Sequence, residues 1–211
     1  MNLKEAYEIL KKANPLLKPL SHGVSLWKKV ILDYFDNLPE EAKLRMALYL
    51  VAVSLDDEMI YKRYFDNLLN EKDDNLRKFM VEILKDNYND YVIESQFSLI
   101  GIRDRVYDRY VRQIASQNII NVIKYMQTKK SIKANIFISR ITKKLLNDGN
   151  TFTRMNAAII LRSIGEKKCL LELEKRLAEE KTLLNKGVND VGIPYVIREI
   201  ERSIAFLKER A

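Results

Sequence analysis

The sequence contains a single cysteine and a single histidine, and this scarcity excludes several kinds of site. The lone Cys169 cannot form an internal disulfide or a cysteine-rich zinc site. With His22 as the only histidine, the usual histidine metal sites and Ser-His-Asp arrangements lack most of their ligands or their base. No glycines have the spacing of a phosphate or dinucleotide loop. We therefore expect no catalytic residues, no metal and no cofactor.

Glycine and proline are also scarce, with six and four residues in a chain of 211. An all-β chain would need many more turn residues, whereas long helices tolerate this scarcity. Apolar residues recur at helical spacing along nearly the whole chain. The composition, 47% hydrophobic and 31% charged, is that of an ordinary globular protein. These features predict an all-α fold.

The chain has little that would place it in a membrane. Its longest apolar run, Met46 to Leu55, is interrupted only by Ser54 and is too short to cross a bilayer. The first residues contain Glu5 and lead into an amphipathic helix without the apolar run of a signal peptide. We therefore expect a cytoplasmic protein without a membrane partner.

The rare residues and the acidic pairs are assigned structural roles. His22 lies at an expected helix start, Cys169 is expected to be buried, and Trp27 is expected in the core of an amphipathic helix. The pairs 56–57 and 73–74 are both Asp-Asp, and both stand where helices begin. Because aspartate caps helix starts, we interpret these pairs as caps rather than metal ligands.

Apolar periodicity divides the chain into about 11–12 helices joined by short links. We expect capping helices over about 1–36, and a C-terminal capping helix over about 194–210. The segment 185–194 is the most loop-like, since Gly187 and Gly192 permit conformations that other residues avoid. The remaining predicted helices in the second half cover about 90–99, 102–116, 118–129, 131–147, 152–164 and 167–181.

These helices form pairs that recur along the chain. Arg45, Arg77 and Arg109 follow one another at steps of 32 residues, near the start or middle of a repeating helix. Helical hairpins at a period of about 30–45 residues are typical of α-solenoids, in which stacked neighbours bury the apolar faces. We predict one helical-repeat domain over 1–211, arranged as a right-handed α-solenoid of stacked antiparallel helical hairpins.

The clearest unit covers about residues 153–181. It begins with Thr153-Arg154, continues through the Ala157-Ala158 pair to Leu161 and Ile164, and ends its first helix at Gly165. Small alanines allow close helix approach, and glycine fits the left-handed residue that ends a helix. This unit resembles the short bacterial HEAT repeat, which also has an arginine, paired alanines, a leucine and then isoleucine-glycine.

The resemblance implies a non-catalytic binding protein, which we expect to be a protein-interaction scaffold or adaptor. Some HEAT-like proteins are alkylpurine DNA glycosylases and others are phycobilin lyases, so enzymatic activity is an alternative. The glycosylase likeness remains architectural, because Trp27 is the sole tryptophan and no catalytic aspartate can be matched. Nothing in the sequence identifies a pigment site.

Positive charge is concentrated in one part of the chain. Residues 101–150 contain 11 Lys/Arg against 3 Asp/Glu, a net charge of +8 that equals that of the whole chain. Helical spacing places two sets of these cations on two helix faces. We predict that they form an anion-binding or partner-binding surface, made of Arg105, Arg109, Arg112, Lys133, Arg140 and Lys144.

Two alternatives to a protein partner remain for this surface. Nucleic acid could bind through residues 101–144, with Tyr107 and Tyr110 stacking on single-stranded bases. The cations could also simply be solvated, with Asp104 and Asp108 pairing with the arginines. The sequence leaves open the partner, the oligomeric state and the role of the 185–194 loop.

Overall fold

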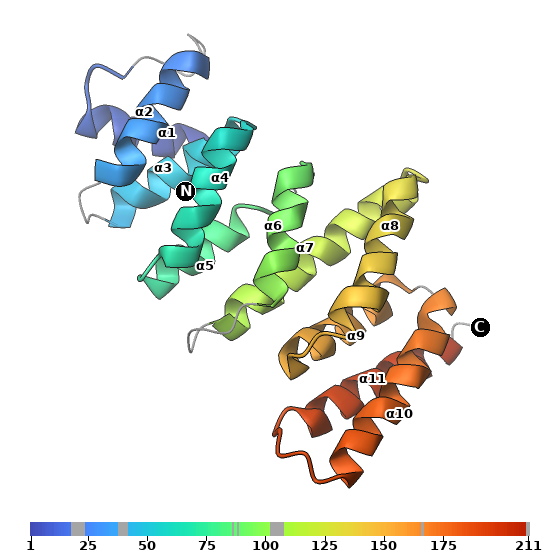
Figure 1. The fold of residues 1–211 in the computed structure, drawn as a ribbon. Helices are drawn as coiled ribbons and strands as arrows, with labels where there is room; N and C mark the ends of the chain where they lie inside the picture. The colour runs from blue at the N-terminus through green and yellow to red at the C-terminus, as the bar shows by residue number, and fades with distance from the viewer. Residues whose placement is uncertain are drawn as a thin grey trace. The chain divides into compact units, whose positions relative to one another are not determined.

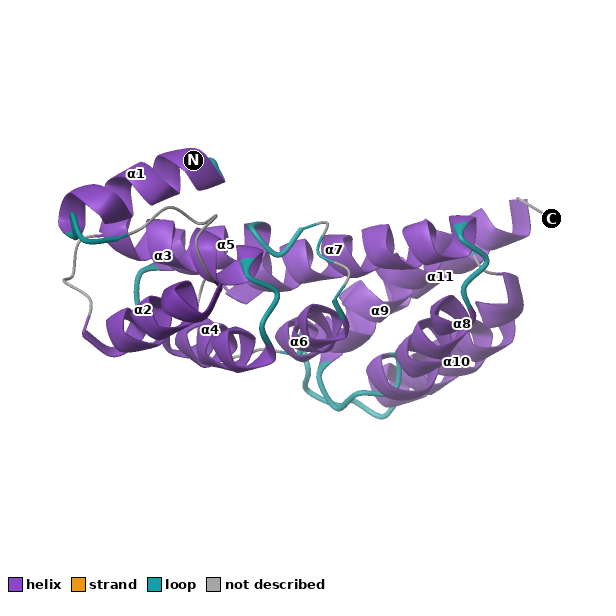
Figure 2. Ribbon diagram, turned by 90° about the horizontal axis from the view of Figure 1, so that it is seen from above, coloured by secondary structure: helices purple, strands orange, loops and turns teal. Residues whose placement is uncertain are grey.

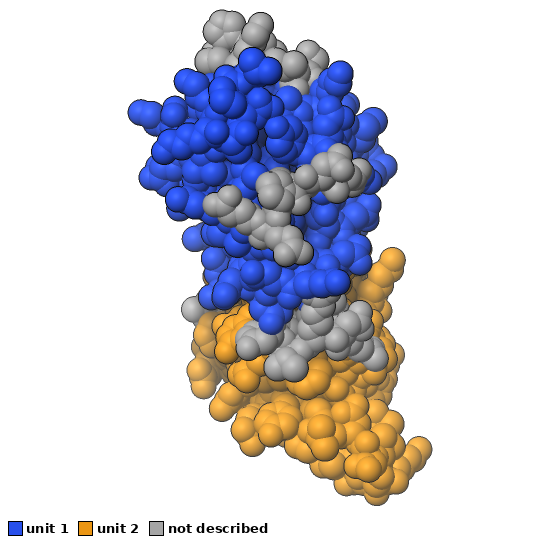
Figure 3. Space-filling model, turned by 90° about the vertical axis from the view of Figure 1, so that its left-hand side faces the viewer, with its two compact units in different colours: residues 1–95 blue, residues 96–211 orange. Residues whose placement is uncertain are grey.

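The structure is a computed structural model that describes residues 1–17, 24–37, 42–85, 87, 89–101, 108–165 and 167–209. Figure 1 shows the fold. Within these residues all regular secondary structure is helical, with eleven α-helices and no strands, which confirms the predicted all-α fold. The chain divides into two compact units, Met1–Ser95 and Gln96–Ala211, which Figure 3 distinguishes by colour. The single domain over 1–211 stays a prediction.

Unit 1 consists of five helices and the first part of a sixth. Their bounds are α1 (Leu3–Ala13), α2 (Val24–Asn37), α3 (Ala42–Ser54), α4 (Glu58–Asn70), α5 (Asp74–Glu82) and α6 (Asp90–Ile100). Helix α3 is central, because it packs against α1, α2, α4 and α5. Its apolar run explains this position, since Ala47, Leu48 and Val51 are all fully buried.

The predicted caps and core residues of unit 1 are confirmed. Asp57 accepts hydrogen bonds from the backbone N–H groups of residues 59 and 60 at 3.0 and 3.2 Å, which caps α4. Asp73 caps α5 in the same way, at 2.9 and 3.1 Å. Trp27 is buried with its ring centroid 5.7 Å from that of Tyr7. His22 lies outside the described residues.

A buried polar group joins α3 to the end of α4. The Tyr49 hydroxyl donates to Glu71 Oε2 at 3.0 Å, and Arg45 Nη2 lies 3.7 Å from Glu71 Oε1. Burial raises the pKa of Tyr49 far above its usual value near 10, and the charge of Glu71 and its hydrogen bond raise it further. Burial likewise raises the pKa values of Tyr61 and Tyr64 in the same core.

We expect the protein to lose stability as the pH rises above about 10. Tyrosines in the unfolded chain ionise there while Tyr49 stays protonated in the fold, so the stabilisation is complete below pH 10 and declines above it. Each such tyrosine contributes at most about 1.4 kcal/mol per pH unit. Urea unfolding between pH 8 and 11 measures the slope, which should be shallower for Tyr49→Phe than for Tyr125→Phe, an exposed control. Equal slopes for the two variants would contradict this origin.

Unit 2 contains the end of α6 and five further α-helices. These are α7 (Asp108–Thr128), α8 (Ile132–Arg140), α9 (Thr151–Ile164), α10 (Leu170–Asn185) and α11 (Ile193–Glu209). A π-helical segment, Ile141–Leu145, extends α8, and a short 3-10 turn, Lys167–Cys169, precedes α10. Helices α7, α9 and α11 pack side by side in one layer, with α8 and α10 in a second layer (Figure 2).

Local features predicted for the segment 153–181 are confirmed. Gly165 ends α9 in the left-handed conformation with φ 74°, and Cys169 is buried. Ala157 and Ala158 are fully buried, and Ser203 of α11 donates its hydroxyl to the Ala158 carbonyl at 3.0 Å. This bond across α9 and α11 shows that the small side chains permit the expected close approach. The predicted C-terminal helix over 194–210 is α11.

One predicted helix break is wrong. Helices were expected over 102–116 and 118–129, but residues 108–128 form the single helix α7, and 102–107 lie outside the described residues. Polar residues near the expected break are accommodated within the helix. The Asn118 side chain is buried and donates to Gln96 Oε1 at 3.4 Å, while Gln117 donates to Asn121 one turn later.

Candidate binding surfaces

The six cations predicted to form one surface have different environments. Arg105 lies outside the described residues. Arg112 is buried, with its guanidinium 5.0 Å from the centre of the Phe152 ring. Arg140 is half-buried, 4.3 Å from the centre of the Phe97 ring. Both arginines therefore pack on aromatic rings from other helices, an arrangement that favours arginine over lysine.

The other three cations are exposed, but they do not lie on one helix face. Arg109 is the second residue of α7, whereas Lys133 lies in the first turn of α8. Lys144 belongs to the π-helical segment. The structure thus brings Lys133, Arg140 and Lys144 onto one continuous helical stretch and leaves Arg109 on another helix.

The outward side of α8 carries an apolar pair that sequence reasoning missed. Ile132 and Ile136 follow one another at i and i+4, and their exposed fractions are 78% and 59%. The opposite side of the helix is filled by Ala134, Phe137 and Ile138, all buried. A helix that is apolar on both sides is normally buried on both sides. The sequence signal for this exposed pair was therefore the presence of more isoleucines in α8 than one buried side needs.

A second exposed apolar residue stands at the beginning of α10. Leu171 is 74% exposed. Two residues before α10, Lys168 donates from Nζ to Asn135 Oδ1 of α8 at 2.6 Å, which places the starts of α8 and α10 next to each other. Figures 1 and 2 show these helices side by side in the same layer. Ile132, Ile136 and Leu171 therefore all face outward from one layer.

Lysines occupy the same helical stretch and the turn before α10. No aspartate or glutamate occurs between Ser131 and Asn147. Four exposed cations lie on α8, on its π-helical extension and on the turn before α10. Lys168, which is bonded to Asn135, is a fifth. The π-helical segment turns two of them outward while Ile141 and Leu145 stay buried. We define the basic–apolar face as Ile132, Ile136, Leu171, Lys133, Lys143, Lys144, Lys167 and Lys168.

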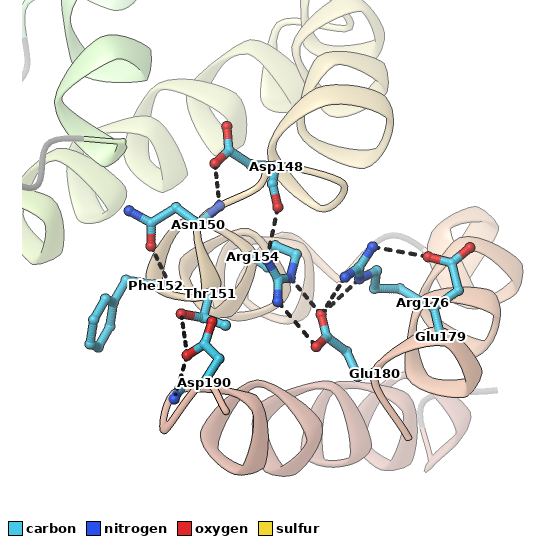
Figure 4. Close-up of polar contacts among 10 residues, drawn as sticks. Asp148, Asn150, Thr151, Phe152, Arg154, Arg176, Glu179, Glu180 and Asp190 are labelled. Carbon is cyan, nitrogen blue, oxygen red and sulfur yellow. Dashed lines mark hydrogen bonds and ion pairs between the residues drawn. The ribbon is translucent and has the colours of Figure 1, made fainter. Parts of the chain in front are cut away.

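A buried ion cluster holds α9 to α10, as Figure 4 shows. Arg154 donates from Nε to Glu180 Oε1 at 2.5 Å and from Nη2 to Oε2 at 3.1 Å. Arg176 also donates to Glu180, at 2.6 and 2.8 Å, and to Glu179 at 2.9 Å. A further Arg154 bond, from Nη1 to the Asp148 carbonyl, measures 2.9 Å. Both oxygens of the buried Glu180 carboxylate accept hydrogen bonds, so this carboxylate has a structural role.

Each unit contains an Arg–Glu pair at the same chain separation, although Arg45 makes a single 3.7 Å contact and Arg154 makes two hydrogen bonds. Arg45 is the fourth residue of α3 and Arg154 the fourth residue of α9. Each approaches a buried glutamate 26 residues later, Glu71 and Glu180 respectively. The fourth residue of α5, Arg77, is also buried. Two of the arginines predicted at steps of 32 thus occupy equivalent positions, whereas the exposed Arg109 does not.

The structure and the comparisons with known proteins add two general findings. Within the described ranges, no three side chains of the metal-binding types lie together in a way that could hold a metal ion. In the same part of the chain, no helix is both long and apolar enough to cross a membrane. No family model and no curated protein matches this sequence.

Proposed function

We propose that the chain is a non-catalytic, cytoplasmic helical-repeat binding protein of the HEAT-like kind, with its hairpins stacked as a right-handed α-solenoid. Its partner is a protein, which presents an acidic amphipathic segment to the basic–apolar face. The repeated Arg–Glu pairs support this reading, because equivalent contacts in equivalent hairpins are what tandem repeats produce. The two-layer packing of unit 2 is also compatible with stacked hairpins.

The exposure of Ile132, Ile136 and Leu171 is the observation that carries the proposal. Each of these side chains leaves most of its surface in water, and together they occupy neighbouring helices of one layer. Single exposed apolar residues are normal, but grouped ones with a polar rim mark protein interaction sites. Isoleucine and leucine at one-turn spacing suit the apolar side of a partner helix.

The charge around these residues specifies the partner. The lysines of the basic–apolar face would attract carboxylates and repel a basic segment, since the stretch 131–147 carries no acidic residue of its own. Exposed lysines chiefly accelerate association and set specificity, whereas the buried apolar contacts supply most of the affinity. An acidic helix with leucines on one side satisfies both requirements.

A designed probe tests this proposal directly. The probe is a fluorescein-labelled 18-residue helix of glutamate and leucine, with leucines along one side, and the control peptide has the same composition in scrambled order. We expect the protein to bind the amphipathic probe and not the scrambled one. Ile136→Ser combined with Leu171→Ser should weaken binding about 10- to 30-fold, because buried apolar anchors dominate such interfaces. Fluorescence anisotropy measures both dissociation constants.

Leu16→Ser is the control variant, since Leu16 is a leucine of unit 1 with an exposed fraction of 88%, higher than that of Leu171. It should bind the probe as the unaltered protein does. Failure of the unaltered protein to prefer the amphipathic probe would overturn the proposal. So would equal loss in the control variant, or binding to vesicles of anionic lipid in place of either peptide.

A further inference from the structure

We propose that unit 2 has a second binding site, for single-stranded nucleic acid, along the edge where α7, α9 and α11 begin. Each helix presents an exposed aromatic residue there: Tyr110, Phe152 and Tyr195, with exposed fractions of 51%, 44% and 55%. They are the third, second and third residues of their helices. Because α7 packs on α9 and α9 on α11, with all three running in the same direction (Figure 1), the rings follow one another along one edge.

Arginines accompany these rings. The Arg112 guanidinium lies 5.0 Å from the centre of the Phe152 ring and so joins α7 to the start of α9. The Arg198 guanidinium lies 5.9 Å from the centre of the Tyr195 ring, and Arg109 is exposed beside Tyr110. We define the arginine–aromatic edge as Arg109, Tyr110, Arg112, Phe152, Tyr195 and Arg198. It differs from the basic–apolar face in its residue types, since that face is made of lysine and aliphatic side chains.

The start of α11 is held against the start of α9. The Thr151 hydroxyl donates to Asp190 Oδ1 at 3.4 Å, and the same oxygen accepts the backbone N–H of Gly192 at 2.8 Å (Figure 4). Thr151 immediately precedes Phe152, while Gly192 stands three residues before Tyr195. These bonds hold together the two helix starts that carry the last two rings, and preorganisation of this kind lowers the cost of binding a long flexible ligand.

A hydrogen-bond donor beside Phe152 is unsatisfied. The Asn150 side chain accepts the backbone N–H of Phe152 at 2.8 Å, but its amide nitrogen has no partner in the described part of the chain. Asn150 is only 5% exposed, and such buried donors are usually paired. Figure 4 shows its amide and the Phe152 ring on the same side of α9. An acceptor-rich ligand at this edge would supply the missing partner.

These features select the ligand class. Nucleobases stack on tyrosine and phenylalanine, while phosphates pair with arginine and with the positive starts of helices. A duplex keeps its bases stacked on one another, so the three rings would have no faces to contact, whereas a single strand exposes its bases. An acidic protein segment would satisfy the arginines but would leave the rings unused. Single-stranded RNA or DNA uses both.

Binding of labelled 12-nucleotide oligo-U and oligo-dT, beside a 12-base-pair duplex, tests the site in the full chain. We expect the single strands to bind more tightly than the duplex. Phe152→Leu and Tyr195→Leu should each weaken single-strand binding at least about fivefold, because each removes one stacked base. If the two exposed arginines of the edge, Arg109 and Arg198, each neutralise one phosphate, the slope of log K against log salt should be about −1.4.

Tyr125→Leu is the matched control, because Tyr125 is an exposed tyrosine near the other end of α7 with the Lys129 amine 5.7 Å from its ring centre. It should bind oligonucleotides like the unaltered protein. Circular dichroism and acidic-probe binding verify that the edge variants remain folded. Absence of single-strand binding at 20 mM salt would overturn the inference, as would equal losses in all three variants. The site does not depend on the proposed protein partner, since Ile136→Ser with Leu171→Ser should leave oligonucleotide binding unchanged.

Discussion

Glu180→Ala is expected to lower the free energy of unfolding by about 3–5 kcal/mol, the usual consequence of removing one partner from a buried ion pair. Glu180 is fully buried and accepts hydrogen bonds from both Arg154 and Arg176. Without it, two guanidinium groups face each other with no carboxylate between them, and Arg154 has no access to water. Urea unfolding followed by circular dichroism measures the loss.

Two further variants separate this mechanism from a general effect on α10. Glu174 also lies on α10, and Glu174→Ala removes its exposed ion pair with Lys208 of α11, which should cost no more than about 1 kcal/mol. The double variant Arg154→Met/Glu180→Leu replaces the buried pair by apolar side chains and should recover most of the stability. A double variant no more stable than Glu180→Ala would show that the unpaired charge is not the cause.

Gly192→Ala is expected to cost about 2–3 kcal/mol, because the added methyl group has no room. A Cβ atom at residue 192 would lie 2.4 Å from Thr151 Oγ1 and 2.7 Å from Thr151 Cβ. Both atoms belong to the first turn of α9, so the link before α11 would have to move away from it. Thermal unfolding measures the cost, and hydrogen exchange should show faster exchange at the starts of α9 and α11.

Gly149→Ala is the matched control for this substitution. Residue 149 lies just before the cap of α9, and nothing stands within 4 Å of the added Cβ. That variant should be neutral or stabilising by up to about 1 kcal/mol, through the reduced freedom of the unfolded chain. If the two alanine variants had equal stability, the close contact with Thr151 would not be the reason for glycine at 192.

Local signals in the sequence predict much of the fold. Helix caps depend on a few adjacent residues, which is why Asp57, Asp73 and Gly165 have the roles that their neighbours indicated. The wrongly predicted helix break near residue 117 arises instead from a contact between residues far apart in the sequence. Asn118 and its partner Gln96 are 22 residues apart, and a polar residue without a visible partner resembles a helix end.

The candidate site was less predictable, because its contacts also join residues that are far apart in the sequence. Helical spacing identified Arg112 and Arg140 as cations on a surface, but it could not reveal the rings of Phe152 and Phe97, which come from other helices. Helical spacing alone also does not show which isoleucines lie outside the core. Only the packing of α8 shows that Ala134, Phe137 and Ile138 already fill its buried side, which leaves Ile132 outside.

Arginine and lysine have different roles within unit 2. Five arginines pair with carboxylates or pack on rings and are at least half-buried, namely Arg112, Arg140, Arg154, Arg162 and Arg176. The lysines of the basic–apolar face are exposed instead. A planar guanidinium forms several fixed bonds at once, whereas a lysine amine is strongly hydrated and remains at the surface. Net charge alone therefore overestimates the number of cations that are accessible to a partner.

The equal 26-residue separation of Arg45–Glu71 and Arg154–Glu180 restricts how the chain can change in length. One residue added inside α10 before Glu180 would rotate that carboxylate by about 100° and carry it about 1.5 Å along the helix, away from Arg154. Deletions inside α9 after Arg154 would act similarly. Segments outside these spans are free of this restriction, and the exposed loop at 186–189 is one of them. Affinity tags or fluorescent reporters belong in that loop, where extra length leaves both ion pairs in register.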